Sequence, residues 1–282
     1  MSKKILILGS NSILSKCLIG SFSSECAIDV AYSGEKSGIE KNKNVNTISL
    51  VELNPKKDYD VIIIVSSFIP EKSEQNNEKL FDVNVKLVGR IIKWFPKSKI
   101  IYCSSVSVFA PNNQGINEKS TVSPVNEYAL SKLWAEKIIQ RNAKSYCILR
   151  ISSLIGKEMK ENTFLPMIIN KALEIKKITL FGDGERKQNY IDAEQVAKLI
   201  LACMDYRKNN VFLAVNNYSY SNKEVAELVQ KQTNCEIEYA GIDESISAIY
   251  DNSYTKQELN FTLNKTIEQS VKEIIEWKQK TF

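Results

Sequence analysis

The sequence contains no histidine among its 282 residues. That absence excludes hydrolytic mechanisms built on a serine–histidine or cysteine–histidine pair. It also argues against a catalytic zinc site, because such sites usually include imidazole ligands, and we expect no metal site. Any proton transfer must therefore use tyrosine, lysine, cysteine, a carboxylic acid or a relay of hydroxyl groups.

Paired cysteines, long apolar runs and clustered charge are lacking as well. The six cysteines form no CxxC pair, which is typical of reduced structural thiols in a cytoplasmic protein. Apolar runs such as VIIIV at 61–65 are too short to cross a bilayer. The first run ends at Gly9 with no cleavage site after it, so we expect no signal peptide. The net charge of +5 comes from dispersed residues, and we expect neither nucleic acid nor a membrane as a partner.

The first 150 residues alternate short apolar runs with segments of helical periodicity. We expect strands at 4–8, 28–32, 46–50, 60–67, 98–105 and 145–151. Helices are expected at 13–22, 78–95 and 126–142. Strands that are separated by helices predict a parallel sheet covered on both faces. The fold class is therefore α/β, a Rossmann-like doubly wound parallel sheet whose ligand site lies at the carboxyl ends of its strands.

The pattern changes after about residue 152. We expect a helix at 164–175 and then a turn-rich stretch at 181–189. These are followed by a helix at 193–205, a strand at 211–215 and helices at 222–232 and 265–279. The pattern predicts a first domain over 1–152 and a smaller C-terminal α/β lobe over 153–282, of which about 190–215 returns to the first domain.

The first strand runs into a turn that has only one glycine. Dinucleotide-binding turns usually carry two more, three and six residues on, but here Ser12 and Ser15 stand at those positions. Gly9 keeps the residue that lets the chain reverse tightly. Serine adds only a hydroxymethyl group, and Ser12 can hydrogen-bond a phosphate at the helix N-terminus. We interpret the turn as a working but modified site rather than a decayed one.

The stretch EYALSK contains the strongest chemical signal. Tyr128 and Lys132 are four residues apart in a predicted helix, so both reach the same site. A neighbouring ammonium lowers the pKa of a phenol and makes it a usable acid or base. Taken alone, such a pair is common on protein surfaces. The hydroxyls of Ser104, Ser105 and Ser107 emerge at the carboxyl end of a predicted strand, and their presence favours the catalytic interpretation.

These segments together resemble the extended short-chain dehydrogenase/reductase superfamily, in particular its NAD(P)-dependent epimerase/dehydratase family acting on nucleotide sugars. The resemblance covers nearly the whole chain. The matching segments, in order, are LILGSNSILS, YDVIIIVSS, FDVNVKLVGRII, SSVSVFA, PVNEYALSKLWAEKII, LRISSLIG, LFGDGERKQNYIDAEQVAKLI and NNYSYSNKEVAELV. It implies an NAD(P)-binding first domain and a substrate-binding lobe.

The resemblance also implies residue roles. Ser105 would hydrogen-bond the C4 oxygen of the sugar, Tyr128 would be the catalytic acid/base, and Lys132 would bind the nicotinamide ribose and lower the tyrosine's pKa. The other cofactor-binding positions would be Gly9, Ser12, Ile13, Leu14, Tyr32, Ser33, Lys36, Leu50, Ser66, Ser67 and Ile151. Besides Ser105, the substrate-binding positions would be Ser107, Ser153, Thr179, Phe181 and Gln188.

Departures from the family pattern bear on the cofactor and the substrate. No acidic residue stands at the tip of the second strand, where Tyr32, Ser33 and Lys36 favour NADPH, with NADH or NAD as alternatives. Gln188 replaces an arginine that grips the substrate diphosphate in many members, so Arg186 or Lys187 would take that role.

The reaction type is inferred from the same departures. The family's dehydratases carry an Asp-Glu pair where this chain has Val106 and Ser107, so we do not expect a dehydratase. The incomplete glycine turn favours NAD(P)H-dependent reduction of a nucleotide-linked 4-keto-6-deoxy sugar, a step in deoxysugar, surface polysaccharide or O-antigen biosynthesis. A nucleotide-sugar 4-epimerase is the first alternative, and a non-catalytic NADP-binding regulatory protein the second. The resemblance further implies a homodimer formed through the helices at 78–95 and 126–142.

Overall fold

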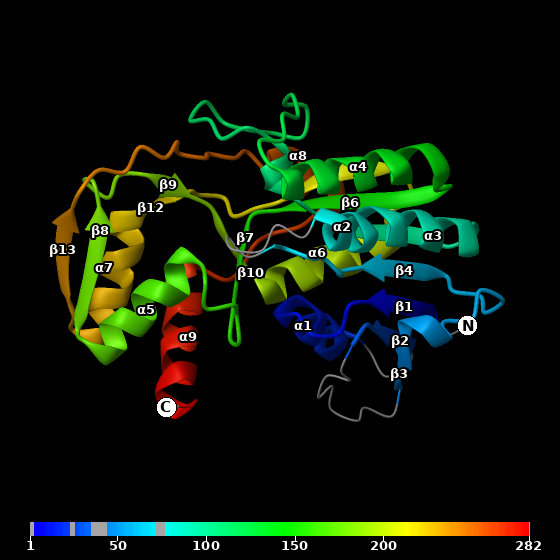
Figure 1. Ribbon diagram of the computed structural model, residues 1–282, viewed down its shortest axis with the longest axis horizontal. Coiled ribbons are helices and arrows are strands. Elements are labelled where there is room, and N and C mark those ends of the chain that lie inside the picture. The colour runs from blue at the N-terminus through cyan, green and yellow to red at the C-terminus, as the bar shows by residue number, and fades with distance from the viewer. Residues whose placement is uncertain (1–2, 23–25, 35–43, 71–76, 282) are drawn as a thin grey trace.

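The computed structural model describes residues 3–22, 26–34, 44–70 and 77–281. Its central feature is a seven-stranded sheet with the strand order β11-β6-β5-β4-β1-β2-β3 (Figure 1). The strands are β1 (Lys4–Leu8), β2 (Ala27–Tyr32), β3 (Val45–Ser49), β4 (Val61–Ile64), β5 (Lys99–Ser105), β6 (Ser145–Ile151) and β11 (Asn210–Ala214). Every neighbouring pair is parallel. The predicted doubly wound α/β class is confirmed, and the strand order reverses between β1 and β4.

Helices cover both faces of this sheet. One face packs against α1 (Ile13–Ser21) and α6 (Ala193–Asp205), and the other against α3 (Leu87–Trp94) and α4 (Glu127–Asn142). The side chains of β1 point alternately to the two faces and so contribute to both apolar cores. Ile5 and Ile7 face the first pair of helices, and Leu6 and Leu8 face the second. A strand buried on both faces reads as a continuous apolar run, which is why these strands were visible in the sequence.

The single helix expected at 78–95 is wrong in one respect. The chain forms α2 (Asn77–Phe81), a π-helical segment (Asp82–Lys86) and then α3. The wider turn accommodates Asn84, which is 1% exposed. Its side chain bonds the backbone N–H and carbonyl of Phe68 at 2.8 and 2.9 Å and the Ser131 hydroxyl at 3.0 Å. The π segment thereby ties the chain after β4 to α4.

The C-terminal lobe has its own apolar core, at the left of Figure 1. Parallel strands β8 (Lys177–Phe181) and β13 (Glu236–Ala240) pack there with three helices. These helices are α5 (Phe164–Glu174), α7 (Asn222–Thr233) and α9 (Ile267–Thr281). Within the stretch expected to be rich in turns, β9 (Lys187–Gln188) pairs antiparallel with β12 (Tyr220–Ser221).

Short elements join the two parts of the chain. Strand β7 (Ser153–Ile155) pairs with β10 (Tyr190–Asp192), directly beyond the carboxyl end of β6. Helix α8 (Ser253–Leu259) contacts β11 and α6, so a late segment also returns to the first sheet. The described residues also include two 3-10 turns, η1 (Leu50–Glu52) and η3 (Val106–Val108). No helix in the described ranges is both long and apolar enough to span a bilayer.

Candidate functional site

The turn after β1 requires glycine. Gly9 has φ +103°, a backbone conformation that L side chains rarely adopt. A Cβ placed on it would lie 2.8 Å from the backbone nitrogen of Ser66, which is closer than non-bonded atoms approach. The turn therefore passes tightly against the chain that leaves β4, at the edge where the strand order reverses.

The serines that replace the second and third glycines are bonded locally. The Ser12 hydroxyl caps α1 by accepting from the Ser15 backbone N–H at 3.1 Å. The Ser15 hydroxyl donates to the Gly9 carbonyl at 2.7 Å and lies 2.8 Å from the Ser12 hydroxyl. Ser15 is fully buried, so its hydroxyl holds the turn onto the helix. Ile13 and Leu14 begin that helix.

The acidic side chain of the second strand does not lie at the strand's carboxyl end, where it could contact a bound ligand. Asp29 lies inside β2, 6% exposed, and bonds Lys57, Tyr59 and Asn46. Burial opposes its ionisation, but these hydrogen bonds hold the pKa of Asp29 below its ordinary value. At the tip, Tyr32 is half-buried and Ser33 exposed, whereas Lys36 lies outside the described residues. Leu50, which opens η1, follows the carboxyl end of β3.

Helix α4 carries Tyr128 and Lys132 to the carboxyl end of β5. Asn126 caps the helix by accepting from the Ala129 N–H at 2.8 Å, which places Tyr128 in the first turn. Lys132 is 2% exposed, and its Nζ donates to the Cys103 carbonyl at 2.8 Å. That Nζ lies 6.0 Å from the centroid of the Tyr128 ring. Ser105 ends β5, and its hydroxyl accepts from the Ser107 N–H at 3.1 Å.

The pKa shifts at this cluster follow from burial and local hydroxyls. Burial raises the pKa of Tyr128, while the Ser67 and Ser105 hydroxyls lower it. Burial lowers the pKa of Lys132 to about 8, against the raising effects of Cys103 and Glu136. Two serine hydroxyls therefore oppose the effect of burial on the pKa of Tyr128. The sequence suggested Ser67 only as a cofactor position.

Two further serines of the site have buried, unbonded hydroxyls. The Oγ atoms of Ser66 and Ser107 are inaccessible to solvent and have no hydrogen-bond partner among the described residues. A buried hydroxyl without a partner costs about 1–3 kcal/mol. Such atoms mark places where a bound molecule can supply the missing hydrogen bond. Ile151 and exposed Ser153 continue the same edge of the sheet at the end of β6.

The lobe positions lie on a strip that leads away from this edge. Tyr190 pairs with Ser153 in the β7–β10 ladder, and Arg186 and Gln188 lie just before it in the chain. The Gln188 amide donates to the Asn222 side chain at 2.7 Å. Burial raises the pKa of Tyr190 and the charge of Arg186 lowers it, so the two side chains interact. The Tyr190 hydroxyl and the Arg186 Nε are buried with no partner in the described part of the chain.

The outer end of the lobe holds the remaining two substrate positions. The Thr179 hydroxyl donates to Glu238 at 2.8 Å, across the β8–β13 pair. The Phe181 side chain at the end of β8 is 63% exposed. The predicted substrate residues are therefore spread over β5, η3, β7, β8 and β9.

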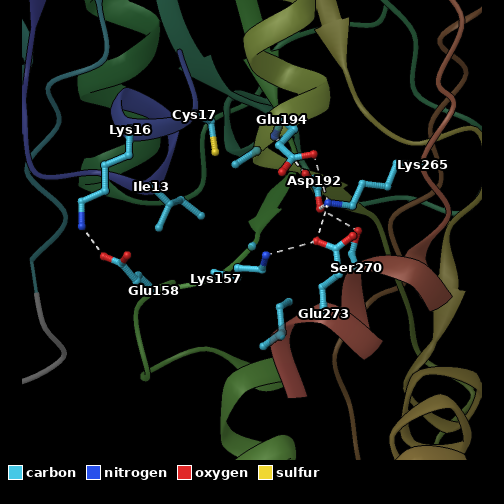
Figure 2. Close-up of a pocket in the computed structure, with 13 residues that line it drawn as sticks. Ile13, Lys16, Cys17, Lys157, Glu158, Asp192, Glu194, Lys265, Ser270 and Glu273 are labelled. Carbon is cyan, nitrogen blue, oxygen red and sulfur yellow. Dashed lines mark hydrogen bonds and ion pairs between the residues drawn. The ribbon is translucent and has the colours of Figure 1, made fainter. Parts of the chain in front are cut away.

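The cavity shown in Figure 2 lies at the joint between α1, α6 and α9, and of the predicted site residues only Ile13 lines it. Its volume is about 130 Å³. Its seven charged side chains pair with one another, and Lys265 contacts three carboxylates. Burial raises the pKa of the nearby Cys17 thiol to about 11. Because each of these charges already has a partner of opposite sign in the cavity wall, we assign the cavity to the packing of the lobe on the first domain.

Curated relatives match parts or most of the chain. The UDP-glucose 4-epimerase of Lactobacillus helveticus is 23% identical over 276 residues, 84% of this chain and 83% of the relative. That of Pasteurella multocida is 28% identical over 212 residues, 64% and 63% of the two chains. The dTDP-D-glucose 4,6-dehydratase of Dictyostelium discoideum is 27% identical over 154 residues. That match covers 49% of this chain and only 36% of the relative's length.

Solved structures share the fold over the full chain. UDP-glucuronic acid 4-epimerase from Bacillus cereus in complex with NAD superposes with a TM-score of 0.86 at 16% identity, covering 99% of both chains. The dTDP-glucose 4,6-dehydratase from Bacillus anthracis in complex with NAD gives 0.85 at 18% identity, covering 99% and 97%. The model of the NAD-dependent epimerase/dehydratase family matches residues 35–215, more than half of the sequence. The chain belongs to this family.

Proposed function

We propose that the protein is an NAD-dependent nucleotide-sugar 4-epimerase. The observation that carries the proposal is the meeting of Ser105, Tyr128 and Lys132 at the carboxyl edge of the sheet, two strands from the Gly9 turn. The curated relatives named as UDP-glucose 4-epimerases support this reaction over the reduction expected from the sequence. Val106 and Ser107 continue to argue against a dehydratase, because that reaction needs an acidic pair there.

The residues present fit a dinucleotide. Gly9 lets the chain turn tightly into the N-terminus of α1, where backbone N–H groups attract a pyrophosphate. The unbonded hydroxyl of Ser66 stands at the same edge, and Lys132 would bind the nicotinamide ribose. When bound, the nicotinamide would accept a hydride from C4 of the sugar and return it to the other face.

The proton chemistry falls to Tyr128 and Ser105. Ser105 would hold the C4 oxygen, and Tyr128 would take its proton during oxidation and give it back during reduction. Burial favours the neutral phenol, whereas the Ser67 and Ser105 hydroxyls stabilise the phenolate. The opposing effects suit a group that must act in both directions.

The substrate diphosphate would be held by Arg186 rather than by Gln188. Gln188 is already bonded to Asn222, whereas the buried Nε of Arg186 has no partner among the residues described. The unbonded Tyr190 hydroxyl would add a second donor to the same group. Planar guanidinium groups bind phosphates through paired hydrogen bonds.

The test is interconversion of C4 epimers. Purified protein with NAD is incubated with UDP-glucose or with UDP-galactose, and with their N-acetylhexosamine counterparts, and the anomeric proton signals are followed by NMR. The same mixture should form from either epimer of one pair, and Tyr128→Phe should not form it. Failure of every pair to interconvert would refute the proposal.

A nucleotide-sugar 4-ketoreductase is the second candidate. It is favoured by the tip of β2, where Asp29 is turned inward and no described acidic side chain faces the ribose of a cofactor. An NADPH-dependent loss of absorbance at 340 nm with a nucleotide-linked 4-keto-6-deoxy sugar would support it. Nucleotide binding without turnover of any of these sugars would support a regulatory protein instead.

We also propose a homodimer that forms through α4 and the helices beside it. The exposed side chains of Leu130 and Trp134, 52% and 50% accessible, lie on α4. Phe81 stacks edge-on against Trp134 at 5.2 Å, so the two helices offer a shared apolar surface. Sedimentation of the wild-type protein and of Trp134→Glu should report a dimer and a monomer, respectively.

A further inference from the structure

A buried ion pair lies directly behind the proposed catalytic residues. Glu136 is 0% exposed and Arg150 is 5% exposed. Arg150 donates to both carboxylate oxygens of Glu136, from Nε at 3.1 Å and from Nη2 at 2.7 Å. The Ser104 hydroxyl donates to the same carboxylate at 2.5 Å. Neither the sequence patterns nor the resemblance pointed to Glu136.

This cluster joins the three elements that carry the site. Glu136 lies one turn beyond Lys132 on α4, and so two turns beyond Tyr128. Ser104 immediately precedes Ser105 on β5, and Arg150 on β6 is the register partner of Ser104. The Phe109 ring covers the guanidinium at 4.7 Å. A shift of α4 along the sheet would therefore break three hydrogen bonds in an interior where unpaired groups are costly.

The carboxylate also belongs to the electrostatic surroundings of Lys132. From β5, the Cys103 carbonyl accepts from the Lys132 ammonium and the Tyr102 ring lies 4.8 Å from it. On α4 itself, Tyr128 and Glu136 flank it. The π segment packed on α4 contributes Asp82 and Lys86, which pair with each other at 2.6 Å. Of these groups, Glu136 and Cys103 favour the ammonium form of Lys132 against the effect of burial.

Stability alone does not account for a charged pair at this depth. Removing two charges from water costs several kcal/mol, and an apolar pair of similar size is often as stable or more so. A buried pair does, however, fix one geometry and one charge distribution. We propose that the Glu136–Arg150 pair is a positioning element of the active site. It sets the register of α4 against β5 and β6, and it places two balanced charges behind Lys132 that act on the ammonium in opposite directions.

The charge part can be tested in the cofactor-free protein. The Lys132 side chain is titrated by NMR of ¹³C,¹⁵N-lysine-labelled protein, with its signal assigned by loss in Lys132→Arg. In Glu136→Gln the positive Arg150 remains, so the Lys132 midpoint should fall by about 0.5–1.5 units. In Arg150→Met the negative Glu136 remains, so the midpoint should rise by a similar amount. The double variant should return close to the wild-type value.

The register part needs a variant that keeps both charges. Ser104→Ala removes only the hydrogen bond to β5, so it should leave the Lys132 midpoint unchanged. We expect it to lower kcat by about 5- to 20-fold, an effect consistent with the sensitivity of catalysis to small misplacements. This second readout rests on the proposed function, whereas the titration needs neither cofactor nor substrate, so the two can fail separately.

Three outcomes would overturn the proposal. The first is an equal midpoint in the folded Glu136→Gln and Arg150→Met proteins, and the second is a shift of both in one direction. The third applies if a single variant does not fold: a folded double variant that keeps wild-type kcat would show that the pair positions nothing. Opposite midpoint shifts, together with a reduced kcat in Ser104→Ala, would support it.

Discussion

Replacement of Gly9 by alanine should weaken both the fold and cofactor binding. At φ +103° an L residue is strained by about 1–2 kcal/mol. The new Cβ would also lie 2.8 Å from the Ser66 nitrogen and 2.9 Å from its Cα. Both are backbone atoms that cannot swing aside, and overpacking of this kind costs about 1–3 kcal/mol. The free energy of unfolding should therefore fall by about 2–5 kcal/mol, as measured by urea denaturation.

Gly20 provides the matched control for this substitution. It lies in α1, the helix that follows the same turn, and a Cβ on it would meet no atom within 4 Å. Alanine there should stabilise the protein by about 0.5–1 kcal/mol through helix propensity and a less flexible unfolded chain. Titration calorimetry with NAD should show weaker binding for Gly9→Ala only. A Gly9→Ala protein with wild-type stability and NAD affinity would refute the tight-turn argument.

Three other predictions test separate parts of the structure, and the second includes a control substitution. Tyr128→Phe should lower kcat by about 10²- to 10⁴-fold with little change in NAD affinity, and near-native turnover would exclude Tyr128 as the acid/base. Lys265→Met leaves three carboxylates without their shared cation and should cost about 1–3 kcal/mol of unfolding free energy. As a control, Lys272→Met on the exposed surface of α9 should lower the unfolding free energy by at most about 0.5 kcal/mol. Equal losses in the two variants would show that the Lys265 cluster stabilises the protein no more than an exposed ion pair does. The folded pKa of Asp29 lies below 3.8, so its stabilisation is present above 3.8 and is lost as pH falls through the folded value. The stability deficit of Asp29→Asn, about 1–3 kcal/mol at pH 7, should therefore shrink in urea titrations below pH 3.8, and a pH-independent deficit would contradict this.

The sheet was readable from the sequence because its strands are buried on both faces. Runs such as VIII in β4 have no polar residue to interrupt them, and helical periodicity marked α4 and α6. The small ladders of the lobe carry no such signal. β9 and β12 are two residues long, too short to show a period of two, and their pairing depends on partners distant in the sequence.

The site was predictable to the extent that motifs report local chemistry. Tyr128 and Lys132 share a helix face, and Ser105 ends a visible strand. The groups that shift their pKa values or hold their helix in place come from other elements. Ser67 reaches Tyr128 from the end of β4, and Asn84 is turned inward by a π segment that helical periodicity does not reveal. Contacts of this kind depend on how strands and helices stack, which a single sequence does not specify.

Interconversion of a C4 epimer pair tests the central claim most directly. Purified protein, NAD and either UDP-glucose or UDP-galactose are followed by NMR of the anomeric protons, with Tyr128→Phe as the control. We expect both starting sugars to approach the same mixture with the wild-type protein and neither to change with the variant. Unchanged sugars with wild-type protein, together with NADPH consumption on a 4-keto sugar nucleotide, would contradict the epimerase and establish the reductase.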